Sequence, residues 1–274
     1  MIRLIKVSKI MFDKVGVHPP GGMYSFGHLA LLLFFGIAAY LFVRFTKNWS
    51  QAQMMIFFKV SSIFLALLEI FKIAWNIAMY GFSIEMLNRF MPLYYCSIYI
   101  YAFLLLSWTK GYVAEASKSW IVYGGIIAGL AFLIYPSSSL LEYPAFHFLS
   151  IHSIFFHAAL VLTGYLLLKF SFYRPQRRDL VKFTYFSLVF MVAAFIMNKT
   201  LGTNLMFLEK PLAMPIFTAL NNISPLLFQI LMFLGQLFLP FVFTHFIFLL
   251  LKQSRRFKIY ENNEKSEEIS TSES

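Results

Sequence analysis

PLLFQILMFLGQLFLPFVFTHFIFLLL, residues 225–251, contains no Asp, Glu, Lys or Arg. An apolar run of about 20 residues is long enough to cross the hydrocarbon core of a bilayer as an α-helix. Lipid offers no hydrogen bonds to an exposed backbone, so only helices and closed barrels can span it. The run lacks the strict alternation of barrel strands, and we therefore predict a transmembrane helix here.

The composition of the whole chain extends this prediction. Of its 274 residues, 59% are hydrophobic and 13% are charged, whereas a soluble domain carries about 25% charged residues. A soluble core of this size could not bury all 34 Phe and 13 Met residues. We predict an all-α, polytopic transmembrane helix bundle of about seven spans. The predicted spans are residues 26–43, 54–80, 90–108, 120–135, 146–168, 183–201 and 225–251.

The chain divides into three parts, of which the bundle, residues 25–251, is the largest. Residues 1–24 mix basic and apolar side chains without the continuous apolar run of a cleaved signal peptide. This pattern favours a short amphipathic helix on the membrane surface, which His-Pro-Pro-Gly-Gly at residues 18–22 would interrupt. Residues 252–274 are polar and are predicted to form a disordered cytoplasmic tail.

The basic residues predict the orientation in the membrane. They gather in the loop after the fifth span and beyond the seventh, namely Arg174, Arg177, Arg178, Lys182, Lys252, Arg255, Arg256 and Lys258. Positive charge is favoured in short cytoplasmic loops, so we predict a multi-pass protein of the plasma membrane with a cytoplasmic C-terminus. Seven spans then put the N-terminus outside. The four basic residues before Pro19 favour the opposite side, which would require one span to lie at the interface.

The net charge of +11 has the same origin in the membrane-facing loops. No basic module with interleaved aromatic residues is visible, so nucleic acid is not expected as a partner. Cys96 is the single cysteine, which excludes an intrachain disulfide.

Polar residues inside the predicted spans are candidate functional residues, because each is costly in lipid. With the predicted orientation, several from separate stretches of chain fall in the outer half of the membrane. They are His28, Glu69, Lys72, Asn76, Cys96, His147, His152, Asn198 and Asn204. We predict that they line a polar cavity in the bundle, open toward the outer face. This relative placement does not depend on which face is outside.

Glu69, Lys72 and Asn76 lie at i, i+3 and i+7 and therefore share one face of the second span. Glu69 and Lys72 can neutralise each other on that face. The sequence leaves two interpretations open for this pair. It either fixes the packing of the helices or takes part in binding or ion relay.

Three histidines in the fifth span, His147, His152 and His157, are spaced five residues apart. Each step of five rotates a helix by about 140°, so the side chains point in three directions. They cannot form the i, i+4 pair of zinc-binding helices, and we expect neither a metal site nor a cofactor. Imidazole titrates near neutral pH, and His152, which lies within the bundle, is the candidate general base. His245, deep in the seventh span, is interpreted as a packing residue.

Cys96 is the candidate nucleophile for acyl transfer, with a small apolar filler as the alternative interpretation. Tyr94, two residues earlier, could donate a hydrogen bond to the head group of a ligand. Asn198, Thr203 and Asn204 are predicted to line the mouth of the cavity. The same residues also suit a helix C-terminus where the chain turns.

Two short segments resemble a known family. Met-Pro-Leu-Tyr-Tyr-Cys-Ser-Ile at residues 91–98 resembles the Leu-Pro-Leu-(His/Tyr)-Leu-Cys signature of the YwaF-type bacterial integral membrane proteins. Residues 198–208 resemble the Asn-…-Gly-Thr-Asn-Tyr-Met-Phe-Leu segment of that family. His28, His147 and His152 match its histidine-bearing helices in place. The resemblance covers residues 20–250.

The YwaF-type family is in turn distantly similar to the transmembrane protein 164 group, for which phospholipid acyl transfer through a Cys and a His has been proposed. In that group the cysteine follows the proline directly and precedes a histidine. Here Leu93 and Tyr94 occupy those positions, and Cys96 lies three residues after Leu93. The resemblance therefore implies an enzyme that acts on lipid acyl groups. His152 matches the histidine of that group better than Cys96 matches its cysteine.

Three classes of function remain compatible with the sequence. The first is a membrane lipid acyltransferase or hydrolase, with membrane lipids as partners and substrates. The second is a transporter or binding protein for a small molecule or ion, although no inverted repeat or pair of broken helices is visible. The third is a structural membrane protein without chemistry. No phosphate-binding loop, dinucleotide fingerprint, metalloprotease helix or haem motif is present.

Overall fold

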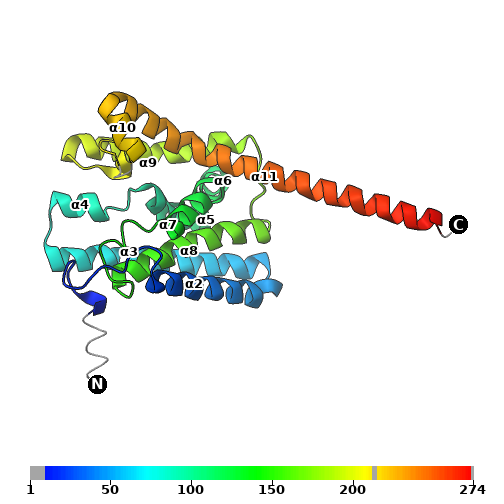
Figure 1. Ribbon diagram of the computed structural model, residues 1–274, viewed down its shortest axis with the longest axis horizontal. Helices are drawn as coiled ribbons and strands as arrows, with labels where there is room; N and C mark the ends of the chain where they lie inside the picture. The colour runs from blue at the N-terminus through cyan, green and yellow to red at the C-terminus, as the bar shows by residue number, and fades with distance from the viewer. Residues whose placement is uncertain (1–9, 212–214, 273–274) are drawn as a thin grey trace, which may run out of the picture.

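The computed structural model describes residues 10–211 and 215–272, with side chains described as far as residue 251 (Figure 1). Within these residues the secondary structure is helical and contains no β-strand. The α-helices are α2 (Phe26–Phe45), α3 (Gln51–Tyr80), α4 (Ile84–Phe90), α5 (Ile98–Trp108), α6 (Gly111–Trp120), α7 (Ile126–Ile134), α8 (Phe148–Lys169), α9 (Asp179–Leu201), α10 (Pro215–Ile223) and α11 (Pro225–Ser272). The shorter helices are η1 (Thr46–Asn48), η2 (Tyr95–Ser97), η3 (Ile121–Gly125) and η4 (Leu205–Phe207).

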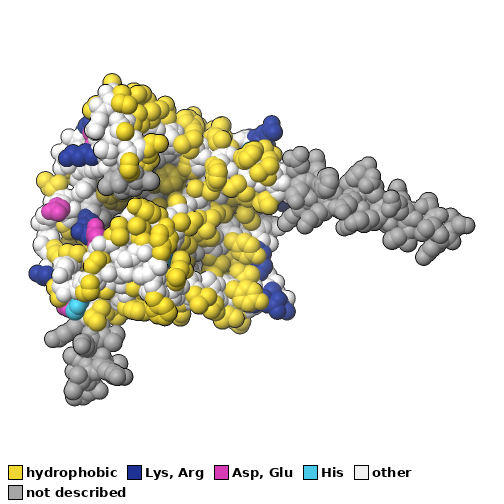
Figure 2. All heavy atoms as spheres, in the orientation of Figure 1, with side chains coloured by type: hydrophobic (Ala, Val, Ile, Leu, Met, Phe, Trp, Pro, Cys, Tyr) yellow, Lys and Arg dark blue, Asp and Glu magenta, His cyan; other side chains and the backbone are white. Residues whose placement is uncertain are grey.

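Six stretches of helix are long and apolar enough to cross a membrane. They are Phe26–Asn48, Gln51–Tyr80, Gly111–Ile134, Phe148–Lys169, Asp179–Leu201 and Pro225–Leu251. The bent pair formed by α4 and by η2 with α5 makes a seventh if it is counted as one span. The prediction of an all-α bundle with about seven spans is confirmed. Charged side chains gather at the two ends of the bundle, while hydrophobic side chains cover its flanks (Figure 2).

The third predicted span, residues 90–108, is not one straight helix. Helix α4 ends at Phe90, and the chain resumes as η2 and α5 after a bend of 65°. Pro92 explains the break, since proline lacks an N–H and disfavours the helical conformation of the residue before it. Met91 accordingly has an extended backbone, with φ −60° and ψ 127°. The 11 residues of α5 reach only about 16 Å, which is shorter than the hydrocarbon core.

The two terminal parts lie partly outside the described residues. Of the predicted amphipathic segment, residues 1–9 are not described, and residues 10–12 are helical. Helix α11 continues to Ser272 as one helix, whereas disorder is predicted from residue 252 onward.

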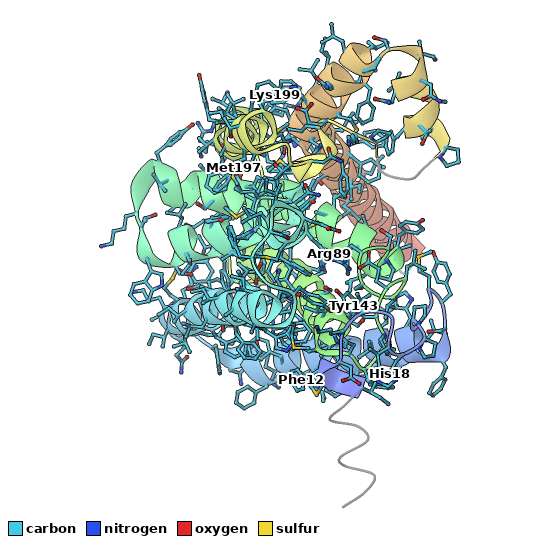
Figure 3. The ribbon with its side chains drawn as sticks, turned by 90° about the vertical axis from the view of Figure 1, so that its left-hand side faces the viewer. Phe12, His18, Arg89, Tyr143, Met197 and Lys199 are labelled. Atoms are coloured by element: carbon cyan, nitrogen blue, oxygen red, sulfur yellow. The ribbon has the colours of Figure 1, made fainter. Side chains whose placement is uncertain are left out.

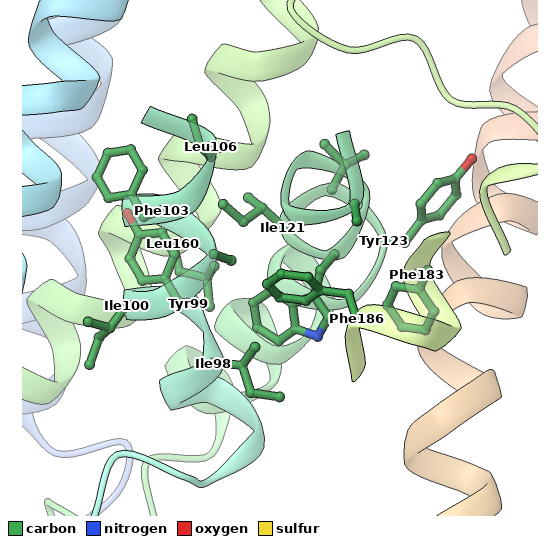
Figure 4. Close-up of a cluster of buried hydrophobic side chains, with 14 of the residues drawn as sticks. Ile98, Tyr99, Ile100, Phe103, Leu106, Ile121, Tyr123, Leu160, Phe183 and Phe186 are labelled. Carbon is green, nitrogen blue, oxygen red and sulfur yellow. The ribbon is translucent and has the colours of Figure 1, made fainter. Parts of the chain in front are cut away.

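The centre of the bundle is built from α5, α6, the π-helix η3 and α7, which pack against one another. Helices α3, α8, α9 and α11 surround this centre, and α2 packs against α8. The core includes large side chains from α3, α5, α6, η3, α8, α9 and α11, of which Figure 4 shows a part. Tyr99, Phe103, Ile121 and Phe183 are almost completely buried there.

Close approach of α7 and α8 depends on Gly129. A β-carbon at this position would lie 2.9 Å from the backbone oxygen of His157 and 2.6 Å from Val161 Cγ2. Small residues allow helices in lipid to pack backbone against backbone, where dispersion forces are largest. Gly36 on α2 differs, because a β-carbon there would meet nothing within 4 Å.

We therefore expect Gly129→Val to lower the stability of the bundle by about 1–3 kcal/mol, because the carbonyl of His157 cannot move aside. Gly36→Ala is the matched control, and its effect should be neutral or slightly stabilising, since alanine favours helix. Thermal unfolding of the two purified variants in detergent measures the difference. Equal midpoints would contradict the close packing of α7 on α8.

Candidate functional site

A buried polar cluster lies between α3 and α8 and centres on Glu69. Lys72 Nζ lies 2.5 Å from Glu69 Oε1, and His152 Nε2 lies 3.5 Å from Glu69 Oε2. The exposed fractions of these side chains are 5% for Glu69, 16% for Lys72 and 5% for His152. Asn76 donates a hydrogen bond of 2.8 Å to the backbone oxygen of Lys72. We call these four residues the Glu69 cluster.

The sequence spacing explains why the cluster forms on α3. Positions i, i+3 and i+7 place Glu69, Lys72 and Asn76 on one face, and Glu69 and Asn76 of this face are buried. Aromatic contacts join the same part of α3 to α8. Phe71 and Trp75 lie with ring centroids 5.3 Å and 6.0 Å from that of Phe148. His152, one turn after Phe148, is thereby carried to the level of Glu69.

The geometry gives the two ring nitrogens of His152 different surroundings. Nε2 lies beside the Glu69 carboxylate, at an ion-pair distance of 3.5 Å from Oε2. Within the described part of the chain, neither ring nitrogen makes a hydrogen bond, and Nε2 is buried. The ring itself is sandwiched by aromatic neighbours, with Phe156 stacked at 5.9 Å and Phe148 tilted at 5.8 Å. The imidazole is therefore held between two aromatic rings, with the Glu69 carboxylate beside Nε2.

The other two histidines of α8 point away from Glu69. His157 binds the backbone oxygen of Ser153 through Nδ1 at 2.7 Å and stacks on Phe132 at 3.6 Å. His147 is the N-cap of α8, where Nδ1 accepts a hydrogen bond of 3.1 Å from the N–H of Leu149. The different directions of the three side chains agree with the predicted rotation between them.

His28 also has a local structural role. Its Nδ1 accepts from the N–H of Tyr24 at 3.1 Å, and its Nε2 lies 3.0 Å from the backbone oxygen of Leu133. These bonds fasten the start of α2 to the end of α7. No contact in the described residues joins His28 to the Glu69 cluster.

Cys96 and Tyr94 lie at the break before α5. The thiol of Cys96 makes a single hydrogen bond in the described structure, of 3.9 Å to the backbone oxygen of Ala128. The hydroxyl of Tyr94 donates to the backbone oxygen of Asn88 at 2.5 Å. Neither side chain contacts a histidine or the Glu69 cluster through any hydrogen bond in the described part of the chain.

Asn198, Thr203 and Asn204 build the turn that follows α9. Asn198 Oδ1 accepts from the hydroxyl of Thr203 at 2.8 Å and from the N–H of Leu205 at 2.7 Å. Gly202 adopts the left-handed conformation, with φ 67°, that ends the helix. Asn204 Oδ1 accepts from the N–H of Lys210 at 2.9 Å. These amides satisfy backbone groups of the turn.

The structure thus brings Glu69, Lys72, Asn76 and His152 together. It places the remaining predicted residues, namely His28, Tyr94, Cys96, His147, Asn198, Thr203 and Asn204, in caps, turns and the break before α5. Within the residues described, no group of three or more His, Cys, Asp and Glu side chains is arranged to hold a metal.

A segment before α2 packs against the ends of α3 and α8 that lie next to the Glu69 cluster in the chain. We call residues 10–22 the strap, and the end of the bundle on which it lies the strap end (Figure 3). The N–H of Val15 donates to the hydroxyl of Tyr80 at 2.9 Å, and His147 Nε2 lies 3.0 Å from the backbone oxygen of Asp13. Phe12 stacks on Phe148 at 5.9 Å. The strap therefore closes over the ends of α3 and α8.

A second polar group, at the opposite end, was not found by sequence reasoning. Asp179 is buried at the start of α9 and accepts hydrogen bonds from the N–H of Gln176 and from Lys182. Tyr123 of η3 donates to the backbone oxygen of Gln176 at 3.2 Å and lies 3.5 Å from His245 Nδ1. The acidic residue at the first helical position was the available signal, since carboxylates stabilise helix N-termini.

Comparison with known proteins identifies the family. The sequence model of the TMEM164 family matches residues 23–250. No curated protein and no solved structure matches the chain. The predicted similarity to the transmembrane protein 164 group is confirmed, while the narrower YwaF-type assignment stays a prediction.

We expect Glu69→Leu to destabilise the protein by about 3–5 kcal/mol, because it leaves the Lys72 ammonium buried without a partner. The double variant Glu69→Leu with Lys72→Leu should recover most of this loss, since an apolar pair needs no compensation. Urea or thermal unfolding in detergent measures both. A double variant as unstable as the single one would show that the ion pair is not the source of the effect.

Low pH should weaken the cap of α8. Burial lowers the pKa of His147 below its usual value, so the folded protein favours the neutral ring. In the unfolded chain the same imidazole titrates at about 6.5. The cap therefore contributes its full share of the free energy of unfolding above a pH of about 6.5, and this contribution falls as the pH decreases. The reason is that a protonated Nδ1 cannot accept a hydrogen bond from the N–H of Leu149. The control is His147→Asn, which caps without titrating. Thermal midpoints between pH 7.5 and 5 should fall less in the variant, and an equal fall would exclude this origin.

Proposed function

This chain belongs to the TMEM164 family. We propose that it is a membrane-embedded enzyme that transfers or hydrolyses the acyl groups of lipids, with His152 as the general base. The observation that carries the proposal is the buried contact of 3.5 Å between His152 Nε2 and Glu69 Oε2. An imidazole oriented by a carboxylate on one nitrogen and free on the other is the arrangement that activates a hydroxyl nucleophile. Contacts of this kind are often long before substrate binds.

The proposed reaction moves an acyl group from one oxygen to another. A hydroxyl of an acceptor lipid, or water, attacks the ester carbonyl of a donor lipid while His152 Nδ1 takes the proton. The carboxylate of Glu69 stabilises the imidazolium that forms. His152 then returns the proton to the leaving alkoxide as the original ester C–O bond breaks. A lipid acceptor makes the protein an acyltransferase, and water makes it a hydrolase.

Lys72 supports this assignment of roles. Its ammonium lies 2.5 Å from the other oxygen of Glu69 and holds that carboxylate in position beside His152. The thiol of Cys96, by contrast, makes one hydrogen bond in the residues described, to the backbone oxygen of Ala128, and none to a histidine or carboxylate. We therefore favour direct transfer over a cysteine-bound intermediate.

Ion or small-molecule transport is the second candidate, and the Glu69–Lys72 pair favours it. Ionisable groups that pair within a span often mark proton or ion relays. Transport predicts that Glu69 and Lys72 variants change uptake without changing lipid composition. The Glu69–His152 contact gives the acyl enzyme the stronger support.

We propose the plasma membrane as the location, with the strap end outside and the C-terminus in the cytoplasm. Basic side chains at the opposite end support this orientation. They include Arg44, Lys47, Lys110, Lys169, Arg174, Arg177, Arg178 and Lys182. Short loops rich in Lys and Arg face the cytoplasm in most membrane proteins.

We expect the lipid composition of cells that express the wild-type chain to change, and the change to disappear with His152→Ala. General-base catalysis contributes about 100- to 10,000-fold in rate, so the loss should be nearly complete. Cys96→Ala should retain the change. Lipidomic comparison at matched levels of membrane protein measures all three.

The control is His157→Gln on the same helix, where the native ring binds its own helix carbonyl and does not contact Glu69. This variant should behave as the wild type does. Loss of the lipid change with both His152→Ala and Cys96→Ala would instead support a cysteine nucleophile. Four identical profiles that match cells without the protein would refute the acyl enzyme.

A further inference from the structure

A lateral groove lies between α9 and α11, far from the Glu69 cluster. Its volume is about 450 Å³. Val192 and Phe195 of α9 form one wall, Ile230 and Phe233 of α11 form the other, and Gln229 is the polar member of the lining. The groove belongs to the halves of α9 and α11 nearer the strap end, where α9 finishes and α11 begins. It has the shape and apolar character that suit a lipid acyl chain.

Polar side chains converge at the end of this groove on Glu209. Lys199 Nζ lies 2.9 Å from Glu209 Oε2, and Gln229 Nε2 donates to the same oxygen at 3.2 Å. Glu209 Oε1 is buried and has no hydrogen-bond partner. The carboxylate therefore uses one oxygen twice and leaves the other without a donor. A buried acceptor of this kind requires a donor from elsewhere.

Lys199 provides the complementary charge beside that vacant acceptor. Half of its side chain is exposed, at 49%, and its Nζ lies 5.4 Å from the ring centroid of Phe195 in the groove wall. An ammonium has three donors, and Glu209 takes one of them. The remaining donors can face a phosphate at the level of the lipid head groups. Figure 3 shows Lys199 on the far side of this end from Phe12 and His18 of the strap.

We propose that this groove binds a phospholipid with a primary ammonium head group, of the phosphatidylethanolamine class. An acyl chain lies in the groove, the phosphate binds Lys199, and the ammonium donates to Glu209 Oε1. Phosphatidylcholine carries the same charges but no N–H, so it leaves Glu209 Oε1 unsatisfied. The site is separate from α3 and α8, and it is independent of the proposed acyl chemistry.

Native mass spectrometry of the purified full chain in detergent tests the proposal. Dioleoyl phosphatidylethanolamine and dioleoyl phosphatidylcholine, supplied at equal concentration, differ only in the head-group nitrogen. We expect about tenfold more bound ethanolamine lipid, the ratio of one charge-assisted hydrogen bond. Glu209→Gln, which keeps the shape and removes the charge, should abolish this preference. Equal binding of the two lipids to the wild type would overturn the proposal.

Two further variants test where the lipid binds. One fills the proposed groove, and the other fills a different groove and so controls for a general effect of the substitution. Ile230→Trp fills the groove without touching the Lys199–Glu209 pair, and it should remove the preferred lipid. Gly36→Leu fills a second lateral groove of about 430 Å³ between α2 and α8, and it should leave the preference unchanged. A preference that survives Ile230→Trp, or that Gly36→Leu removes, would contradict binding between α9 and α11.

Discussion

The absence of hydrogen-bond partners in lipid is the constraint on which this structure depends. Within a regular helix the backbone N–H and C=O groups pair with one another over most of each span. Where the helix is interrupted, polar side chains provide the missing hydrogen bonds. Tyr94 donates to a backbone oxygen at the break before α5, and Asn198 binds both the N–H and the backbone oxygen of Leu205 in the turn after α9. His28 and His147 do the same at the starts of α2 and α8. Most of the polar residues near the strap end thus complete the backbone.

The Glu69 cluster stands apart from this pattern, because its charges do not satisfy broken backbone. Glu69 and Lys72 lie in the middle of an uninterrupted helix of 30 residues. A buried ion pair rarely adds stability over an apolar pair of similar size. Its presence, with His152 on the facing helix, is the reason that we propose a chemical role for the cluster and not packing alone.

Much of the fold could be predicted from the sequence, because long apolar runs have few alternatives in lipid. The predicted fourth span began at residue 120, whereas the helix begins at Gly111, since Glu115 and Lys118 made the earlier stretch look polar. They neutralise each other at 2.7 Å. The shared face of Glu69, Lys72 and Asn76 also followed from spacing. Which histidine would meet Glu69 did not, because that depends on the rotation of α8 against α3, and only tertiary packing sets it.

The strap has a consequence for how the protein is made. It rests on Tyr80 and His147, which leave the ribosome long after residues 10–22. During synthesis residues 10–22 can therefore contact α3 first, and their contacts with His147 and Phe148 form only after α8 has been inserted. Domains usually fold from the N-terminus as they emerge, but here residues 10–22 complete their contacts only after α8 is present. A fusion partner attached ahead of residue 10 would interfere with this final step more than one attached beyond α11.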